Sequence, residues 1–324
     1  MNRISKLVFL FAAIIPSLAS AQQRDYTPDP LVGEWLDKSS NTLAQTYIDK
    51  TSGLYCLNIS HNPYANEEPD VVLQGKLNGG KLEFSNTEGW TARIDRKKLI
   101  AKGPEWSFKG ERVDRVSPTL GLPAPENAEI LFDGTNLDCW GAVEEKEWLK
   151  GSRPASEAAS IVNGYLEIIP GQGSLVTKDF YKDYHMHLEF RLLGEKTNGG
   201  VYLHSRYELN IGDSWGIGKG NPTGTFGNIK TPEHPAPAYN YALPPMVWQT
   251  MDIDFTAPRL NDAGQKVSNA RITMYLNGNL IYDDVEVDKV KGAAGKLGEA
   301  ELGPIYLQEH GTAYQFNNIW IVRK

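Results

Sequence analysis

The chain has 324 residues, with 33 Lys and Arg against 40 Asp and Glu, a formal net charge of −7 and 40% hydrophobic residues. This acidic balance disfavours nucleic acid and anionic membranes as partners, because both would repel the protein. The length suggests two domains. The two cysteines, Cys56 and Cys139, match no metal-ligand spacing. They could pair in an oxidising compartment or remain as separate buried thiols.

The first residues have the three regions of a secretory signal peptide. Arg3 and Lys6 supply the charged region, Leu7–Ile15 the apolar region and Ala19–Ala21 the small residues before a cleavage site. We therefore expect residues 1–21 to be removed and the mature protein to be periplasmic or secreted. No later run approaches the roughly 20 apolar residues that a membrane-spanning helix needs, so we expect no membrane span.

Residues 22–116 predict a small antiparallel β domain of unknown role. Asn78-Gly79-Gly80 separates two alternating segments, Val71–Leu77 and Lys81–Phe84, and is a strong hairpin signal. Shorter segments of the same kind surround Trp35 and Trp90. We expect these strands to form a meander or a half-barrel.

Residues 117–127 contain three prolines and one glycine, which interrupt any strand or helix pattern. We expect this segment to be an extended linker between the small domain and residues 128–324.

Residues 128–324 predict a second, larger domain, which makes the whole chain all-β. Segments that alternate with period two, or that are rich in β-branched and aromatic residues, recur with turn signals such as Asn277-Gly278. Many short strands with little helical periodicity indicate a sandwich or jelly roll. The predicted strands are Ile161–Ile169, Tyr184–Leu192, Trp248–Phe255, Arg271–Leu276, Pro304–Gln308 and Phe316–Val322.

One segment of this domain, Asn198–Asp213, concentrates charged side chains in a predicted strand-turn-strand unit. Successive side chains of a strand point to opposite faces. We therefore expect Tyr202 and His204 to share one face of the first strand, and Glu208 and Asn210 to share one face of the next.

Arg206 lies between apolar residues of this segment, where a guanidinium is costly unless it is paired or meets a ligand. Glu208 and Asp213 are its nearest candidate partners in the sequence. Two interpretations remain open, a structural ion pair and a ligand-binding role.

Period two also predicts a polar face along Tyr184–Arg191, made by His185, His187, Glu189 and Arg191. This face is either a solvated outer surface or part of a concave sheet that faces substrate. Two histidines at this spacing can bind a transition metal, but no third ligand is identified.

The segment Gly303–Gly311 places Tyr306, Gln308 and His310 on one face. An imidazole titrates near pH 6.5, about the right range for proton transfer, so His310 is a candidate acid or base. The alternative is an ordinary histidine at a loop end.

Aromatic residues of the larger domain could contact a sugar. Trp248 is either a sugar platform or an aromatic at the edge of the core. The segment Gly212–Leu243 is long and rich in glycine and proline, and loops of this length are often lids or binding walls. Trp215 is one of its aromatic residues.

From Ile130 to Arg323 the chain carries short motifs in a fixed order: Leu131–Leu137 with Trp140, Asn163-Gly164, His187–Phe190, Asn198–Asp213, Trp248–Thr250, Asn277-Gly278, Leu307–Gly311 and Asn318-Ile319. In this order the motifs resemble the 3-keto-disaccharide hydrolase family. The resemblance implies a concanavalin-like jelly-roll sandwich, a location in the cell envelope and action on glycosides oxidised to a ketone at sugar carbon 3. By position it points to His187, Glu189, Arg206, Glu208, Asp213, Gln308 and His310. The chain departs from the family pattern at Gly199, Asn210 and Asn317, where serine, glutamine and arginine are common.

The implied reaction needs a base for the proton on carbon 2, an acid for the leaving group and a stabiliser of the enolate. We expect His310 or His187 as base or acid, Glu208 as the carboxylate partner or the alternative base, and Arg206 as the stabiliser. A divalent cation could share the last role, with Asp213 as a ligand. NAD is not implied, because the sequence has no Gly-rich strand-to-helix turn. The residues expected to bind the oxidised oligosaccharide or glycoside are Glu189, His204, Asn210, Gln308, Trp248 and Trp215.

Two rival functions come from other classes. A retaining glucanase on the same fold needs two carboxylates about 5 to 5.5 Å apart, and the sequence has no Glu-x-Asp-x-Glu motif to supply them. A noncatalytic carbohydrate-binding protein stays open, because aromatic loops on a sandwich bind sugars without reacting. Activity on an oxidised but not on a native glycoside would separate this alternative from an enzyme.

Overall fold

A computed structural model describes residues 26–79, 81–95, 97–144, 147–227, 237–288, 290 and 294–324, so the predicted signal peptide lies outside the described residues. Within these ranges the regular secondary structure is β-strand apart from two short 3₁₀ helices, η1 (Ala155–Glu157) and η2 (Ala294–Leu297). The predicted all-β class is therefore confirmed. None of the described helices is long and apolar enough to cross a membrane.

The first strands close into a barrel in which each strand pairs with the next and β1 also pairs with β8. Its strands are β1 (Gly33–Asp37), β2 (Thr42–Ile48), β3 (Tyr55–Ser60), β4 (Val71–Asn78), β5 (Lys81–Ser85), β6 (Thr91–Asp95), β7 (Lys98–Lys102) and β8 (Ser107–Val113). Large side chains such as Trp35, Phe84 and Phe108 fill the interior, as expected for a barrel of this size. The expected meander is present, and it closes on itself.

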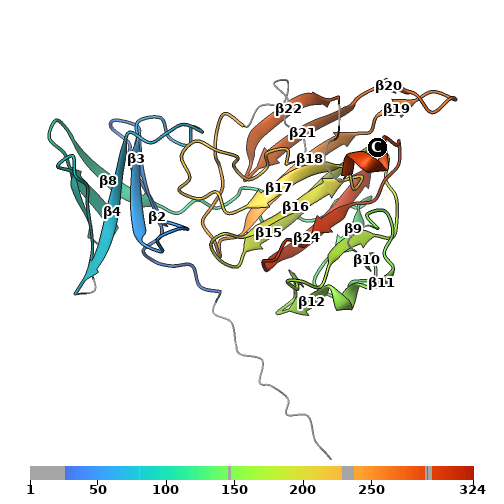
Figure 1. Cartoon of the computed structure of the whole chain (residues 1–324), viewed down its shortest axis with the longest axis horizontal. Helices are drawn as coiled ribbons and strands as arrows, with labels where there is room; N and C mark the ends of the chain where they lie inside the picture. Colours follow the sequence, from blue (N-terminus) through green and yellow to red (C-terminus); the bar gives the residue numbers. More distant parts are fainter. Residues whose placement is uncertain are drawn as a thin grey trace, which may run out of the picture.

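The rest of the chain forms two sheets that enclose one apolar core. The six-stranded sheet has the order β11 (Arg153–Pro154), β10 (Trp140–Val143), β14 (Ser174–Thr177), β23 (Tyr306–Gln308), β16 (Asn198–Leu203) and β17 (Tyr207–Gly212). The eight-stranded sheet has the order β12 (Ala159–Val162), β13 (Tyr165–Ile168), β24 (Tyr314–Arg323), β15 (Tyr184–Leu192), β18 (Gln249–Thr256), β21 (Ala270–Leu276) and β22 (Asn279–Val287), with β9 (Glu129–Phe132) beside β24. A small hairpin, β19 (Arg259–Leu260) with β20 (Lys266–Ser268), lies outside both sheets. Figure 1 shows the barrel at one end of the molecule and the two sheets at the other.

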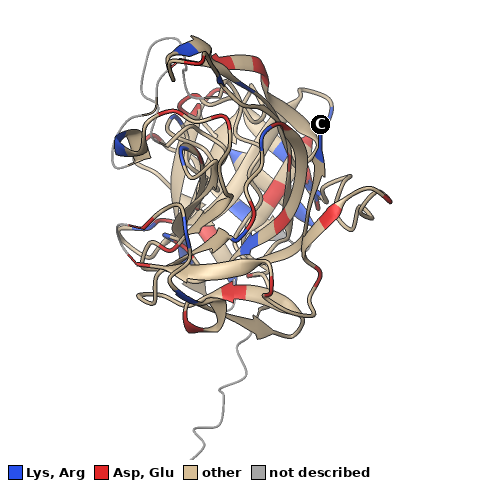
Figure 2. Ribbon diagram, turned by 90° about the vertical axis from the view of Figure 1, so that its right-hand side faces the viewer, with Lys and Arg blue, Asp and Glu red and all other residues tan. Residues whose placement is uncertain are grey.

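Charged residues of both signs are interspersed over the strands and loops at the sandwich end of the molecule (Figure 2). Cys56 is buried in the barrel and Cys139 is partly buried in the sandwich, and both are free thiols. The expectation that they could pair is therefore not met, and the alternative of two separate thiols holds.

The predicted linker packs against the sandwich over much of its length. Thr119 Oγ1 donates a hydrogen bond to Asp252 Oδ2 at 2.8 Å, and the Gly121 amide donates to Glu189 Oε1 at 2.6 Å. Asn318 Nδ2 in turn donates to the carbonyl of Leu122 at 2.8 Å. Because prolines keep this segment out of the strand ladders, it binds through side chains and isolated backbone groups. The linker thus covers the part of the outer face of the eight-stranded sheet that β15, β18 and β24 form.

This cover buries the polar face that period two predicts for β15. His187 is fully buried, donates through Nδ1 to Asp252 Oδ1 at 2.6 Å and stacks on Trp320 with ring centroids 5.1 Å apart. Burial lowers the pKa of His187, but the hydrogen bond to Asp252 and the carboxylate of Glu189, 3.8 Å from Nε2, outweigh burial, so the pKa is raised. Burial raises the pKa of Glu189, whereas His187 and the amides of Asn318 and Gly121 lower it more, to about 2. His187 therefore lies between two carboxylates that favour its protonated form.

The expected roles of His187 as acid or base and of Glu189 as a substrate ligand need a face that substrate can reach. Both side chains are instead closed off by the linker. We assign them to the attachment of the linker to the sheet.

Trp248 also has a structural partner. The guanidinium of Arg191 lies 4.8 Å from the centroid of the Trp248 ring, and also against the rings of Tyr26 and Tyr165. Such contacts of a cation with aromatic faces are favourable when they are partly desolvated. Tyr26 lies at the start of the described chain, so this cluster ties the N-terminal segment to the sandwich. The expectation of a sugar platform at Trp248 is not supported.

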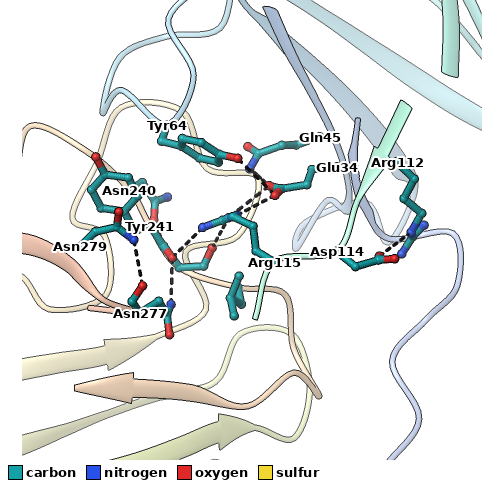
Figure 3. Close-up of polar contacts among 12 residues, drawn as sticks. Glu34, Gln45, Tyr64, Arg112, Asp114, Arg115, Asn240, Tyr241, Asn277 and Asn279 are labelled. Carbon is teal, nitrogen blue, oxygen red and sulfur yellow. Dashed lines mark hydrogen bonds and ion pairs between the residues drawn. The ribbon is translucent and has the colours of Figure 1, made fainter. Parts of the chain in front are cut away.

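A buried ion pair joins the barrel to the sandwich (Figure 3). Arg115 binds Glu34 of β1 with both ends of its guanidinium, Nε to Oε1 at 2.6 Å and Nη2 to Oε2 at 3.1 Å. The same guanidinium donates to the carbonyls of Tyr241 and Ala242 in the long loop. Bidentate pairs of this type add orientation as well as energy. Arg115, which lies between the barrel and the linker in the sequence, therefore ties the barrel to the long loop.

The long loop also fills the junction with residues that we expected at a sugar site. Trp215 is buried, and its Nε1 donates to the carbonyl of Thr46 in β2 at 2.8 Å. Asp213 forms an ion pair with Lys50 of the barrel at 3.3 Å. These contacts place both residues between the barrel and the sandwich, where Trp215 is part of the packing.

The raised pKa of His187 gives a prediction about the stability of the protein. Asp252→Asn removes the carboxylate that binds His187 Nδ1, and breaking such a buried pair should lower the free energy of unfolding by roughly 3 kcal/mol. A raised pKa means that folding favours the protonated ring, so the effect should be full below the unfolded value of 6.5 and shrink as the pH rises through the folded pKa. Urea unfolding of both proteins between about pH 5 and pH 9 measures this difference. A difference that grows with pH would contradict a charged His187.

Candidate functional site

The outer face of the six-stranded sheet carries a row of polar and aromatic side chains. Strand pairing sets Tyr202 of β16 between Glu208 of β17 and Tyr306 of β23. Two residues before Tyr202, on the same face of β16, Gly200 lies between Asn210 and Gln308. The predicted shared face of Glu208 and Asn210 is therefore confirmed, and Gln308 joins them from the neighbouring strand.

Gly200 has no side chain, so Tyr202 and Glu208 can lie close to its backbone in the middle of this face. A Cβ atom placed on it would lie 3.0 Å from the Tyr202 ring and 3.2 to 3.3 Å from Cγ and Oε1 of Glu208. These distances are at the lower limit of normal packing. Any side chain at this position would therefore press on the carboxylate of Glu208, and glycine lets Glu208 and Tyr202 lean over the strand.

Tyr202 links the two neighbouring polar groups. Its hydroxyl accepts a hydrogen bond from Gln308 Nε2 at 3.1 Å, and Glu208 lies against its other side. Burial, together with the charge and hydrogen bond of Glu208, raises the pKa of Tyr202. The phenol therefore stays protonated and can donate a hydrogen bond at neutral pH. Tyr202 was not among the site residues predicted from the sequence, although its position opposite Glu208 in a predicted hairpin could have indicated it.

An aromatic wall borders this group. Trp148 stacks on Tyr306 with ring centroids 5.0 Å apart and planes within 5°, and it meets Tyr202 edge-on at 5.3 Å. A pocket of about 680 Å³ lies beside this wall, and its lining includes Trp148, Tyr306, Gln308 and His310. Such a volume accommodates a small ligand such as one or two sugar rings. Trp148 and Tyr306 were also not selected from the sequence.

His310 is exposed at the edge of the same pocket. Its Nδ1 lies 3.0 Å from Nδ2 of Asn198, the first residue of β16. Because an amide nitrogen donates, Nδ1 accepts, and the ring proton of the neutral imidazole then sits on Nε2. Asn198 thus orients His310 as a proton donor through Nε2.

The long loop closes one side of the site. The Asn210 amide donates to the carbonyl of Thr225 at 2.9 Å, and the Gly227 amide donates to the carbonyl of Glu208 at 3.2 Å. Residues 224–227 therefore run beside β17 as an extra edge. A Cβ atom at Gly227 would lie 2.2 Å from Cδ of Glu208, so only glycine fits here. This part of the loop lies against Glu208, whereas residues 228–236 lie outside the described residues.

Arg206 binds backbone carbonyl groups, a kind of partner that we did not expect. Its Nε donates to the carbonyl of Gly298 at 2.5 Å, and its Nη1 donates to the carbonyl of His204 at 2.8 Å. Gly298 directly follows η2, and a guanidinium at the end of a helix satisfies its free carbonyls. Arg206 therefore fixes η2 to the turn between β16 and β17, and its expected role as enolate stabiliser is not supported.

His204 also departs from the expectation, because its φ of +54° breaks the alternation of β16. The ring is buried against Phe255, with centroids 4.6 Å apart. Burial and the nearby charge of Arg206 lower the pKa of His204 to about 4, so the ring is neutral. The ring also lies with Nε2 3.1 Å from the carbonyl of Lys182, so its position is set by the core of the sandwich.

The predicted metal ligand, Asp213, has Lys50 as its partner. Among the residues that the structure describes, no three His, Cys, Asp or Glu side chains are grouped so that they could hold a metal ion. The donor set does not fit a bound divalent cation, and we derive no step of the reaction through one.

Comparisons with known proteins identify the family of the sandwich domain. Residues 127–322 match the family described as 3-keto-alpha-glucoside-1,2-lyase-like domain. A crystal structure of a candidate glycosyl hydrolase from Parabacteroides distasonis ATCC 8503 is 27% identical, with a TM-score of 0.51, over 62% of this chain and 85% of that chain. A second candidate glycosyl hydrolase from the same organism is 22% identical, with a TM-score of 0.42, over 61% of this chain and 99% of that chain.

A search of curated proteins found no match. The family match and the first of these structures support a carbohydrate-active protein that acts on glycosides. Because the matched residues make up more than half of the chain, the protein belongs to the 3-keto-alpha-glucoside-1,2-lyase-like domain family.

Proposed function

We propose that the protein cleaves glycosides whose sugar carries a ketone at carbon 3. The proposal rests on one observation above all: Glu208 is the single Asp or Glu in the strands of the six-stranded sheet, and it lies beside a protonated phenol. A retaining glycosidase needs two carboxylates on either side of the bond. An elimination next to a ketone needs one base, and Glu208 is the one carboxylate on the strands of this face, whereas Glu144 and Glu309 line the neighbouring pocket from the loops.

The chemistry proceeds in two stages. Glu208 removes the proton on carbon 2, and the electron pair moves through the enolate to expel the aglycone oxygen from carbon 1, which takes up a proton. Water then adds across the new double bond, with hydroxide at carbon 1 and a proton at carbon 2. The sum is hydrolysis, and no electrons enter or leave.

Neutral donors on this face supply the stabilisation that the enolate needs. The amides of Asn210 and Gln308 flank Gly200, and the Tyr202 hydroxyl lies next to Gln308. Hydrogen bonds aimed at a developing oxyanion are among the largest contributions to catalysis. These donors would stabilise the enolate, the role that we expected for Arg206 from the sequence.

The alternative is a noncatalytic carbohydrate-binding protein, which the aromatic wall of Trp148 and Tyr306 also suits. A 3-keto-glucoside with a nitrophenyl leaving group distinguishes the two functions. We expect release of nitrophenol from this compound, with or without chelator, and none from the native glucoside. Binding without release from either compound would favour the alternative.

We further propose that the protein acts in the periplasm or outside the cell, after cleavage following Ala21. The proposal rests on the signal-peptide pattern of residues 1–21. Mass spectrometry of the protein purified from a secreting host should give an N-terminus at Gln22.

The role of Glu208 as base gives the next prediction. Glu208→Gln keeps the shape of the side chain but removes the base, so kcat/KM should fall by about 10² to 10⁴ for every leaving group. The variant should also stop exchanging the carbon 2 proton of a 3-keto sugar with deuterated solvent, which NMR detects directly. Unchanged exchange would assign the base to another residue.

The role of Gly200 can be tested without touching a polar group. Gly200→Ala adds one methyl group that must displace Glu208 by a few tenths of an ångström. Positioning errors of this kind are costly in catalysis, so we expect kcat to fall about tenfold with little loss of stability. The matched control is Gly194→Ala, because a Cβ atom there meets nothing within 4 Å. Equal activities of the two variants would contradict the proposed geometry.

His310 is assigned as the acid that protonates the leaving group. A nitrophenolate leaves without a proton, whereas an alkoxide does not. His310→Gln should therefore slow cleavage of a methyl 3-keto-glucoside by about 10², yet slow the nitrophenyl compound less than about threefold. If both substrates slow equally, His310 has another role.

A further inference from the structure

A second cavity, distinct from the site on the six-stranded sheet, lies between the barrel and the sandwich. It has a volume of about 410 Å³, within the range of small-molecule sites. Val32 and Ile48 of the barrel line it on one side, and Trp215, Leu243, Met246 and Val247 on the other. It shares no lining residue with the pocket beside Trp148.

Most of the charged groups around this cavity are already paired. Arg115 binds Glu34, Arg112 binds Asp114 at 3.0 Å, and Lys50 binds Asp213 at 3.3 Å (Figure 3 shows the first two pairs). Two lining carboxylates remain, those of Asp29 and Glu195. The cavity therefore carries an excess of negative charge.

Among the described residues, Asp29 accepts hydrogen bonds from two neutral groups, the Tyr55 hydroxyl at 2.6 Å and the Leu31 amide at 2.8 Å. Within the described part of the chain, Glu195 has no ion pair. Burial raises the pKa of Glu195, and the charges of Asp213 and Asp29 raise it further, whereas Lys196 lowers it less. Within the described residues, neither Asp29 nor Glu195 forms an ion pair with Lys or Arg, and Glu195 is exposed at the rim of the cavity.

We propose that this cavity binds a small organic cation, an ammonium group on an apolar body. The ammonium would lie near Asp29 and Glu195, and the apolar body would fill the space along Trp215 and Met246. An anion would meet the unpaired carboxylates, so the charge selects a cation. A bare metal ion would leave the apolar walls without a partner and would lack a third ligand among the described residues.

The wall of the cavity is held in a strained conformation. Met246 has a φ of +69°, which is unfavourable for a residue with a long side chain, and its amide donates to the carbonyl of Leu192. Such strain is often found where a protein preforms a ligand site. Because the walls come from the barrel and the sandwich, a bound cation would also strengthen the contact between them.

The test uses n-hexylammonium chloride as the probe, with hexanoate and hexanol as controls for charge. Isothermal titration calorimetry on the full mature protein should show saturable binding of hexylammonium, and the melting temperature should rise with its concentration. Hexanoate should not bind, and hexanol should bind at least tenfold more weakly. Binding of hexanoate equal to that of hexylammonium, or no binding of hexylammonium, would overturn the proposal.

Two variants locate the site. Glu195→Gln removes the unpaired charge and should weaken hexylammonium binding at least tenfold, whereas Glu88→Gln, at an exposed position of the barrel, should not change it. Gly194→Leu should fill the cavity, because a Cβ atom at Gly194 meets nothing within 4 Å, and should abolish binding. Full binding by the folded Gly194→Leu protein would place the cation elsewhere and refute the assignment.

Discussion

The buried polar face of β15 is the constraint on which the arrangement of the molecule depends. His187 and Glu189 cannot be left in an apolar contact, and their hydrogen bonds come from Asp252 of the same sheet and Gly121 of the linker. Once residues 117–122 are fixed on this face, Arg115 is held close to the sandwich and can reach both Glu34 and the long loop. The position of the barrel thus follows from the need to cover a charged strand.

The linker makes the two outer faces of the sandwich different, because among the described residues it packs on the eight-stranded sheet and not on the six-stranded sheet. The face of the eight-stranded sheet along β15 is occupied by the chain itself, so no substrate can reach His187. The face of the six-stranded sheet keeps its pocket beside the aromatic wall of Trp148 and Tyr306. The register of β16 with its neighbours then brings Glu208, Asn210 and Gln308 together there.

Period two predicted which side chains share a face, and this held for β15, β17 and β23 because it follows from local strand geometry. It could not show which face would be covered, because Glu189 meets Gly121 across 68 positions of the sequence. The carbonyl partner of Arg206 could not be predicted for a similar reason, since Gly298 is 92 positions away in the sequence. The predicted shared face of Tyr202 and His204 was wrong for a local reason. His204 directly follows β16 and has a left-handed backbone, so its side chain does not continue the alternation of the strand. The residues added by the structure, Tyr202, Tyr306 and Trp148, are aromatic and had no distinctive motif.

The spacing of the strands fits the proposed elimination. Neighbouring strands are about 4.8 Å apart, so β17 and β23, on either side of β16, are separated by roughly 10 Å. Glu208 stands on β17, and the pocket with His310 begins at β23. A sugar ring over Gly200 would therefore have its base on one side and its leaving group on the other. This arrangement suits an elimination in which one residue removes the proton at carbon 2 and a second residue protonates the oxygen that leaves carbon 1.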